Sequence, residues 1–451
     1  MSDESLLPFL SRFDPAESSE GSLDPLGLYS MADALGVRLA PGVRERQRNP
    51  RFLTLALVGM AARARAGIAD AAPSGLPAWL VYEWVVVESL VGRLLAPEGS
   101  AADAQGIPGR DKVLASLRAK DALSVANYLK SPAVFGFHGI YKVLGTKSRL
   151  FDAAGRVGEA GLAVLRGWEA DNQLHGFVEG EGPGVELSRA IAKAVERGLD
   201  KGCSQMSGRR GGLADLVCKY LDHRQPGEQE GNALWSALLG DALRREVLEL
   251  LTSAAGQAAW TEAVDDEAAM HAWMRERASP ELRAVLAAVA AIERLFRLLT
   301  DAFDEVRAHL HGAGAIAFSR LAEGMAMQQA AQASPDAFAQ ARARLDEVDP
   351  SQRAKLESAL AWTSESHAPS AFAQALLAHH EGVQRGKPPN GKRSWFDTWT
   401  DGRIAVRPAY ALHVFEPRPR RYVHQYRLVP LWSFAVRMGR VQAVGATGED
   451  H

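Results

Sequence analysis

Apolar residues recur at helical spacing along much of the chain. The clearest case runs from Ser279-Pro280 to Gly312, where the apolar positions are separated alternately by four and three residues. A period of 3.5 is typical of a long helix with one buried seam, and also of a coiled coil. We expect a helix packed within a bundle, with a dimerising coiled coil as the alternative. The seam residues are Val285, Val289, Ile292, Phe296, Leu299, Phe303, Val306 and Leu310.

Helix-start signals predict several shorter helices. Asn49-Pro50 predicts a helix over residues 51–66, because Asn is a favoured cap and Pro is favoured in the first turn. Ser334-Pro335, Asp349-Pro350 and Pro369-Ser370 predict three further helices after the long one. Helices therefore account for most of the chain.

After His380 the helical spacing gives way to short β-branched and aromatic segments between turn signals. Residues 403–407 and 410–415 are predicted to pair as strands. Residues 422–428 are either a third strand or an extended arm. We expect a small α+β module in this part of the chain.

The segment 109–180 has a more specific order of elements. A helix near 111–118 precedes a short helix near 124–129, and Ser131-Pro132 opens the helix "AVFGFHGIYKVLG". The stretch "KSRLFD", the turn "AAGR" and another helix follow. This order resembles the winged helix-turn-helix domain. The resemblance implies that the second helix of the pair is the recognition helix, with Phe135, His138, Tyr141, Lys142 and Lys147 offered to a partner, either DNA or protein.

These patterns together predict a mainly α protein with six segments. They are a flexible leader at 1–25, a helical N-terminal region at 26–108, a winged-helix-like module at 109–180, a helical bundle with one long helix at 181–380, a basic aromatic-rich α+β module at 381–440 and a disordered tail at 441–451.

Composition places the chain among ordinary globular proteins, with 47% hydrophobic and 24% charged residues. No apolar run is long enough to span a bilayer, and the first residues lack the features of a signal peptide. Two cysteines give no disulfide framework. These features predict a cytoplasmic protein with no membrane partner.

The net charge of −2 conceals an uneven distribution. Residues 385–440 carry twelve Lys and Arg against three acidic residues, a net +9, which leaves −11 for the rest of the chain. The same window holds nine of the 33 aromatic residues. Such a segment indicates a polyanionic partner, because Arg can contact a phosphate bidentately and aromatic rings can stack on bases.

Three interpretations of this basic segment stay open. It binds nucleic acid, or it docks onto acidic side chains of its own chain or of a partner protein, or its arginines are the solvated side of a small domain. An arginine cluster within residues 38–51 has similar alternatives. The candidate nucleic-acid-binding residues of the whole chain are Arg44, Arg46, Arg48, Arg51, His138, Lys142, Lys147, Lys392, Arg393, Arg418, Arg420, Arg421, Tyr422, Tyr426 and Arg427.

The chain carries no recognisable catalytic or metal-binding motif. The stretch "GIYKVLGTKS" departs from the phosphate-loop pattern, and no nucleophile–base pair or paired zinc-ligand spacing is present. Cys203 and Cys218 are predicted to be structural, and we expect no cofactor and no metal. The catalytic residues of any activity stay unknown, because a diffuse active site leaves no linear trace.

Three stretches resemble uncharacterised bacterial proteins that are encoded in phage-defence islands: "DPLGLYSMADALGVRLAPGVRERQRNPRFLTLALVG", "YLKSPAVFGFHGIYKVLG" and "KRSWF…YVHQYRLVPLWSF". The resemblance implies a DNA-binding accessory subunit of a defence complex that contains a helicase, a nuclease or an ATPase. One alternative is a protein-docking scaffold without affinity for nucleic acid. Another is a nuclease or nucleotide-processing enzyme without a recognisable motif.

Overall fold

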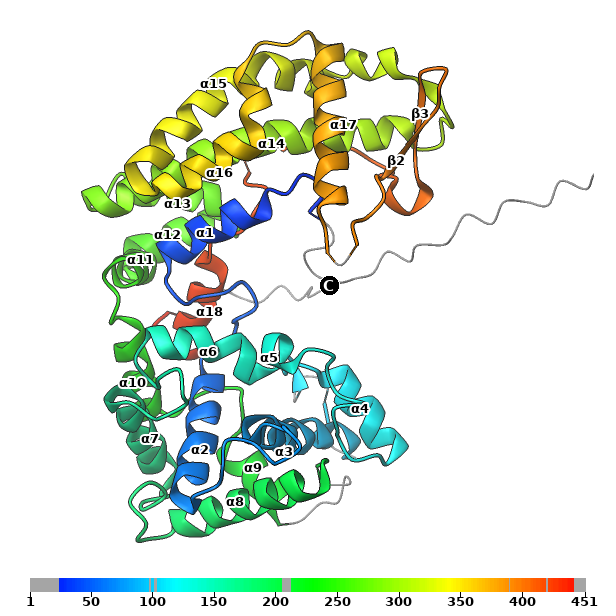
Figure 1. Cartoon of the computed structure of the whole chain (residues 1–451). Coiled ribbons are helices and arrows are strands. Elements are labelled where there is room, and N and C mark those ends of the chain that lie inside the picture. Colours follow the sequence, from blue (N-terminus) through cyan, green and yellow to red (C-terminus); the bar gives the residue numbers. More distant parts are fainter. Residues whose placement is uncertain are drawn as a thin grey trace, which may run out of the picture. The chain divides into compact units, whose positions relative to one another are not determined.

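The computed structural model describes residues 24–96, 99–100, 104–204, 212–388, 390–418 and 421–441. The predicted leader up to residue 23, Arg420 and the predicted tail from residue 442 lie outside these residues. The fold is mainly α, as predicted, with one small sheet in the described part of the chain (Figure 1). No helix within the described ranges has both the length and the apolar character needed to cross a membrane.

The chain divides into two compact units that each combine segments distant in sequence. Unit 1 comprises residues 1–35 and 284–424, and unit 2 comprises residues 36–283 and 425–451. The stretch 381–440, predicted as one module, is therefore shared between the two units.

Unit 2 is built around two helices, α2 (Arg51–Ala66) and α3 (Ala78–Gly92). The bounds of α2 are those predicted from Asn49-Pro50. α3 is largely apolar, with Glu83 and Glu88 as exceptions, and is buried from Leu80 to Val91, as expected for the central helix of a core. A hydrogen bond at 2.8 Å joins the two helices, with the Tyr82 hydroxyl of α3 donating to the Leu55 carbonyl of α2.

Other helices surround this pair. Both α6 and α8 pack on α2 and α3, while α7 packs on α2 and α10. The helices of unit 2 besides α2 and α3 are η1 (Arg93–Leu95), α4 (Arg110–Ala119), α5 (Pro132–Phe135), α6 (Phe137–Lys147), α7 (Glu159–Asn172), α8 (Gly184–Lys201), α9 (Leu213–Tyr220), α10 (Glu228–Leu238), α11 (Ala242–Thr252), α12 (Ala254–Ala263), α13 (Glu267–Arg275) and α18 (Leu428–Arg437).

Of the helices expected of the winged-helix-like module, α4 and α7 are present, whereas residues 124–129 form a turn rather than a short helix. The helix predicted to open at Ser131-Pro132 is divided in two, α5 and α6, by the extended backbone of Gly136. After α6, Phe151 and Val157 form an isolated antiparallel bridge across the predicted turn, and α7 follows. Gly136 precedes α6, and a Cβ at this position would collide with the carboxylate of Glu83. Glycine therefore admits the Glu83 side chain to the start of α6.

Unit 1 is organised by the long helix α14 (Pro280–Leu310), which belongs to this unit from residue 284 onward. The eight predicted seam residues are each at most 2% exposed, so the seam is buried within the chain. The Phe303 ring, for example, lies 4.9 Å from the ring of His380, 5.7 Å from Trp395 and 5.5 Å from Phe396. The period of 3.5 thus reflects a packed helix.

Pro350 and Pro369 begin helices as predicted, whereas Ser334-Pro335 does not. Pro335 lies inside α15, where apolar residues on both sides of the proline are buried and keep the helix continuous. Besides α14, the helices of unit 1 are η3 (Phe318–Glu323), α15 (Met325–Val348), α16 (Pro350–Leu360), η4 (Ala361–Ser364), α17 (Pro369–Arg385), η5 (Pro408–Tyr410) and the first part of α1 (Tyr29–Leu39).

The small sheet of unit 1 has the order β1-β3-β2, with both pairings antiparallel. Its strands are β1 (Ile316–Ala317), β2 (Phe396–Thr398) and β3 (Arg403–Val406). β3 lies in the predicted segment, but it does not pair with residues 410–415. Pro408, which lacks a backbone N–H, begins η5 after β3 and ends the strand pattern. Residues 421–427 form no strand, and α18 begins at Leu428.

Replacing Phe303 by Ala should lower the free energy of unfolding by about 3–5 kcal/mol, because a buried ring is removed and its cavity is only partly refilled. Urea unfolding followed by circular dichroism measures this change. Met325→Ala is the matched control, since Met325 is 81% exposed and its replacement should alter stability by about 0.5 kcal/mol or less. Equal losses of stability in the two variants would contradict the buried seam.

Candidate functional site

In unit 1, residues of the basic segment 385–440 contact acidic side chains of their own chain. Arg418 pairs with Asp301 at 2.9 Å and with Asp304 at 3.0 Å, and both are buried carboxylates of α14. His424 contacts Glu293 of the same helix at 2.7 Å. Intramolecular docking, one of the alternatives left open by the sequence, is therefore what the structure shows for Arg418 and His424.

The other candidates in unit 1 lie on or near its surface. Arg393 is exposed and pairs with Asp397 at 3.2 Å. Arg421 is exposed, while Lys392 and Tyr422 are half-buried. No described contact joins these four candidates into one site.

Tyr426 and Arg427, in unit 2, are fully buried, which corrects the expectation that they contact nucleic acid. The guanidinium of Arg427 pairs with Glu45 at 2.7 Å. The carboxylate of Glu267 accepts the backbone N–H groups of Tyr426 and, at 2.8 Å, of Leu428, so it caps the start of α18. Burial raises the pKa of Glu267 to about 7. These two candidates anchor the start of α18.

Arg51 is a second correction, because it is buried at the start of α2. Its guanidinium pairs with Glu230 at 3.2 Å and donates to the Gln225 carbonyl at 2.6 Å. A charged group that is buried and paired in this way is held by the fold and is not offered to a phosphate. Arg51 therefore ties α2 to α10 and to the segment that precedes α10.

The loop between α1 and α2 lies along α6. The side-chain amide of Gln47 donates to the Ile140 carbonyl at 2.8 Å, and the N–H of Asn49 donates to the Tyr141 hydroxyl at 2.8 Å. Gln47, Asn49 and Tyr141 are all buried, so water does not compete for these hydrogen bonds. The winged-helix resemblance implies that Tyr141 faces a partner, but this side chain instead fastens the loop to the helix.

Four candidate cations are exposed, two on this loop and two on α6. Arg46 lies over the Phe135 ring, with its guanidinium carbon 4.9 Å from the ring centroid. A Cβ on Gly42 would lie 3.1 Å from the Cβ of Lys147, which shows how closely the loop follows the helix. Arg44, from the same loop, is half-buried. We call the four residues Arg46, Arg48, Lys142 and Lys147 the basic face.

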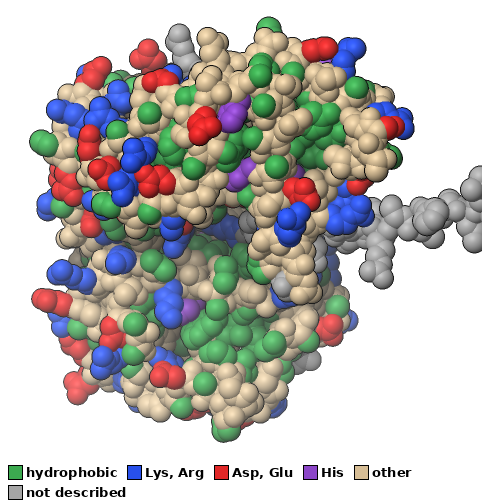
Figure 2. Space-filling model, turned by 45° about the horizontal axis from the view of Figure 1, so that its top comes forward, with side chains coloured by type: hydrophobic (Ala, Val, Ile, Leu, Met, Phe, Trp, Pro, Cys, Tyr) green, Lys and Arg blue, Asp and Glu red, His purple; other side chains and the backbone are tan. Residues whose placement is uncertain are grey.

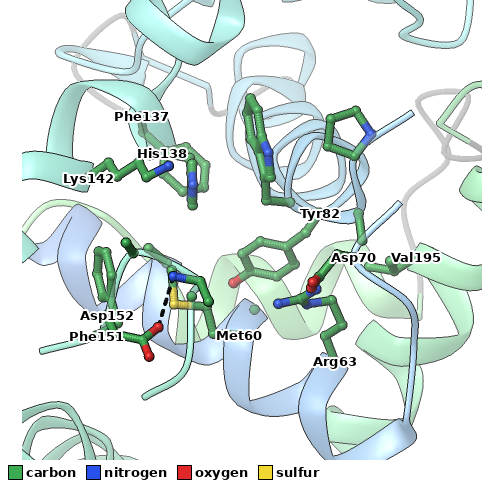
Figure 3. Close-up of a pocket in the computed structure, with 18 residues that line it drawn as sticks. Met60, Arg63, Asp70, Tyr82, Phe137, His138, Lys142, Phe151, Asp152 and Val195 are labelled. Atoms are coloured by element: carbon green, nitrogen blue, oxygen red, sulfur yellow. Dashed lines mark hydrogen bonds and ion pairs between the residues drawn. The ribbon is translucent and has the colours of Figure 1, made fainter. Parts of the chain in front are cut away.

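A cavity of about 200 Å³ opens beside α6, between α2, α3 and the turn at 152–155 (Figure 3). Its walls are largely apolar and include Met60, Tyr82, Phe137 and Phe151. The charged side chains that line it are Arg63, Asp70, Lys142 and Asp152. Lys142 is thus part of both the cavity and the basic face.

Trp79 and His138 stack at this cavity, with ring centroids 4.6 Å apart and planes 14° from parallel. Burial, followed by the charges of Lys142 and Arg63, lowers the pKa of His138 to about 4. The imidazole is therefore neutral near pH 7 and offers one hydrogen-bond donor and one acceptor.

Glu83 positions His138 from the buried side. Its carboxylate accepts the Tyr128 hydroxyl at 2.8 Å and the backbone N–H of His138 at 2.8 Å. Burial raises the pKa of Glu83 to about 7, although both hydrogen bonds favour the charged form. The sequence did carry a signal for this residue, because an acid within an otherwise apolar helix is unusual.

Within the described ranges, no cluster of three or more His, Cys, Asp or Glu side chains is arranged to hold a metal ion. Cys203 and Cys218 are free thiols, and the Cys218 thiol donates to the Ser89 carbonyl at 3.2 Å. Comparison with protein-family models, curated proteins and solved structures finds no match to this chain.

The raised pKa of Glu83 predicts a pH-dependent stability. Its carboxyl titrates near 4.5 in the unfolded chain and near 7 in the fold, so it contributes stability below pH 4.5 that is lost as the pH rises through 7. Between pH 5 and pH 8 the free energy of unfolding of the wild type should fall by about 2–3 kcal/mol relative to that of Glu83→Gln, at about 1.4 kcal/mol per pKa unit.

Urea unfolding of both proteins at several pH values measures this difference, in which the contributions of other buried groups cancel. Glu365→Gln, on the exposed surface, is the control for the loss of one carboxyl group. A difference between Glu83→Gln and the wild type that stays constant over this pH range would exclude the proposed protonation of the buried carboxyl.

Proposed function

We propose that the basic face of unit 2 binds the phosphate backbone of nucleic acid. This would make the protein a DNA-binding accessory subunit, as its resemblance to defence-island proteins implies. One observation carries the proposal, namely that buried hydrogen bonds hold together a loop and a helix distant in sequence, and that these two segments carry four exposed cations. Two of them come from the loop before α2 and two from α6.

The chemistry of the basic face suits a backbone ligand. The guanidinium groups of Arg46 and Arg48 provide planar forks for phosphate oxygens, and Lys142 and Lys147 add mobile point charges. Backbone contacts need no matching pattern of base edges, so cations on a helix and an adjacent loop are sufficient. α6 is also the helix to which the winged-helix resemblance assigns recognition.

The basic segment 385–440 contributes less to this proposal than its charge suggests. Arg418 is neutralised by two carboxylates of α14, and Arg427 is buried against Glu45. Charge that is already paired within the chain releases no counterions from DNA and adds little to affinity. The net +9 of the segment therefore overstates what is available to a polyanion.

A second candidate function is favoured by apolar side chains near the basic face. Val134 of α5 is 58% exposed and Val143 of α6 is 40% exposed. Figure 2 shows hydrophobic side chains gathered into exposed patches on one face of the molecule, with Lys and Arg side chains around them. Such a mixture also suits a protein partner, so a docking scaffold for a helicase, nuclease or ATPase is the alternative.

Titration of the full chain with duplex DNA over a range of salt concentrations tests the first candidate. Binding through phosphates should give a negative slope of log K against log salt. The triple variant Arg48→Ala, Lys142→Ala, Lys147→Ala should bind more weakly, and its slope should shrink by about 0.9 for each phosphate that the variant no longer neutralises.

A matched control removes three exposed cations of unit 1, with Arg393→Ala, Arg403→Ala and Arg421→Ala. Its net charge changes equally, yet its slope should stay near that of the wild type. Equal losses of affinity in the two triple variants would assign DNA binding to net charge. That result would overturn the proposal that the basic face is the binding site. Absence of DNA binding at low salt, with co-purification of a protein partner, would favour the docking scaffold.

A further inference from the structure

The cavity beside α6 has the size and lining of a site for a flat ring system. Its volume of about 200 Å³ lies below the range of about 300–1,000 Å³ that is usual for drug-sized ligands. One or two fused rings therefore fit, whereas a large cofactor does not. The aromatic side chains of Tyr82, Phe137 and Phe151 line it, together with Met60 (Figure 3). Flat aromatic ligands gain most from such walls.

The Trp79–His138 pair adds polar groups to this apolar lining. In the described part of the chain, neither the indole N–H of Trp79 nor the imidazole of His138 has a hydrogen-bond partner. Both rings line the cavity, so a ligand there can meet two donors and one acceptor. A heterocycle with nitrogen and oxygen atoms on its edge satisfies these groups, while a hydrocarbon ring leaves them unpaired.

The charges around the cavity favour an anionic substituent on that ring. Arg63 pairs with Asp70, and Asp152 pairs with Arg156 at 2.7 Å, so the two acids that line the cavity are already neutralised. Lys142 lines the same cavity, is exposed, and has no carboxylate partner among the described residues. Its ammonium group is available to a phosphate oxygen.

We propose that this cavity binds a nucleobase, with the attached phosphate at Lys142. The inference deepens the proposed function. It rests on that function if the base belongs to a nucleic-acid strand whose backbone contacts the basic face. Lys142 joins the two sites, because it is shared by the basic face and the cavity. A free nucleotide presents the same chemistry as a base within a strand. Experiment separates these two sources of the nucleobase.

Isothermal titration of the full chain with two kinds of probe tests the inference. The first kind is the set of four deoxynucleoside monophosphates, and the second is a short single-stranded oligonucleotide with its fully abasic counterpart. We expect the oligonucleotide with bases to bind about 5- to 140-fold more tightly than the abasic strand. Stacking is worth about 1–3 kcal/mol per base, and about 1.4 kcal/mol corresponds to a factor of ten.

The variant Ala153→Trp blocks the cavity from an exposed turn position without removing any core side chain. It should bind the strand with bases no more tightly than the abasic strand, while Ala153→Ser, which leaves the cavity open, should behave as the wild type. Trp79→Ala should have the same effect as Ala153→Trp by removing the stacked pair. Thermal unfolding shows whether each variant is folded.

The outcomes separate this inference from the proposed function. Equal binding of both strands, unchanged by Ala153→Trp, together with no binding of mononucleotides, would overturn the cavity site and leave the basic face standing. Binding of a mononucleotide that Ala153→Trp abolishes, without binding of either strand, would support the cavity as a nucleotide site and overturn the proposed function.

Discussion

The candidate site depends on the hydrogen bonds by which the buried side chain of Gln47 and the backbone of Asn49 fasten the loop before α2 to α6. Without these bonds, Arg46 and Arg48 would belong to a free loop, and their positions relative to Lys142 and Lys147 would be undefined. The bonds are shielded from water, and breaking either leaves a buried polar group unpaired at a cost of about 1–3 kcal/mol. A surface loop thus acquires the rigidity that a binding surface needs.

A buried carboxyl group organises the other side of α6. Glu83 receives hydrogen bonds from the Tyr128 hydroxyl and the first turn of α6, and Gly136 leaves room for its approach. Glu267 acts similarly on α18. In both helices a backbone N–H group of the first turn donates to a carboxylate supplied by another helix. Burial of these acids raises their pKa values, while the helix N-terminus offsets part of that cost. Stability and the placement of His138 are therefore linked through Glu83.

Formal charge is a poor guide to the available charge in this protein. Residues 385–440 form the most basic segment of the sequence, yet Arg418 and Arg427 are matched by acids more than a hundred residues away in sequence. Pairing of this kind lowers the repulsion that a segment of net +9 would otherwise create. By contrast, the exposed cations of α6 and the preceding loop are spread over two segments, so their density along the sequence is lower.

Local patterns in the sequence were sufficient to determine the mainly helical fold, the bounds of α2, the long helix α14 and its buried seam. Each rests on spacing and capping signals within a few turns of chain. They failed at Pro335, where burial on both sides overrides a helix-breaking residue, and at 410–415, whose expected strand partner pairs elsewhere. Only the tertiary structure decided which candidate binding residues are buried and which acids pair with the basic segment 385–440. It also decided that Trp79, His138 and Lys142 share a cavity. Those facts depend on contacts between segments distant in sequence, and no local pattern encodes them.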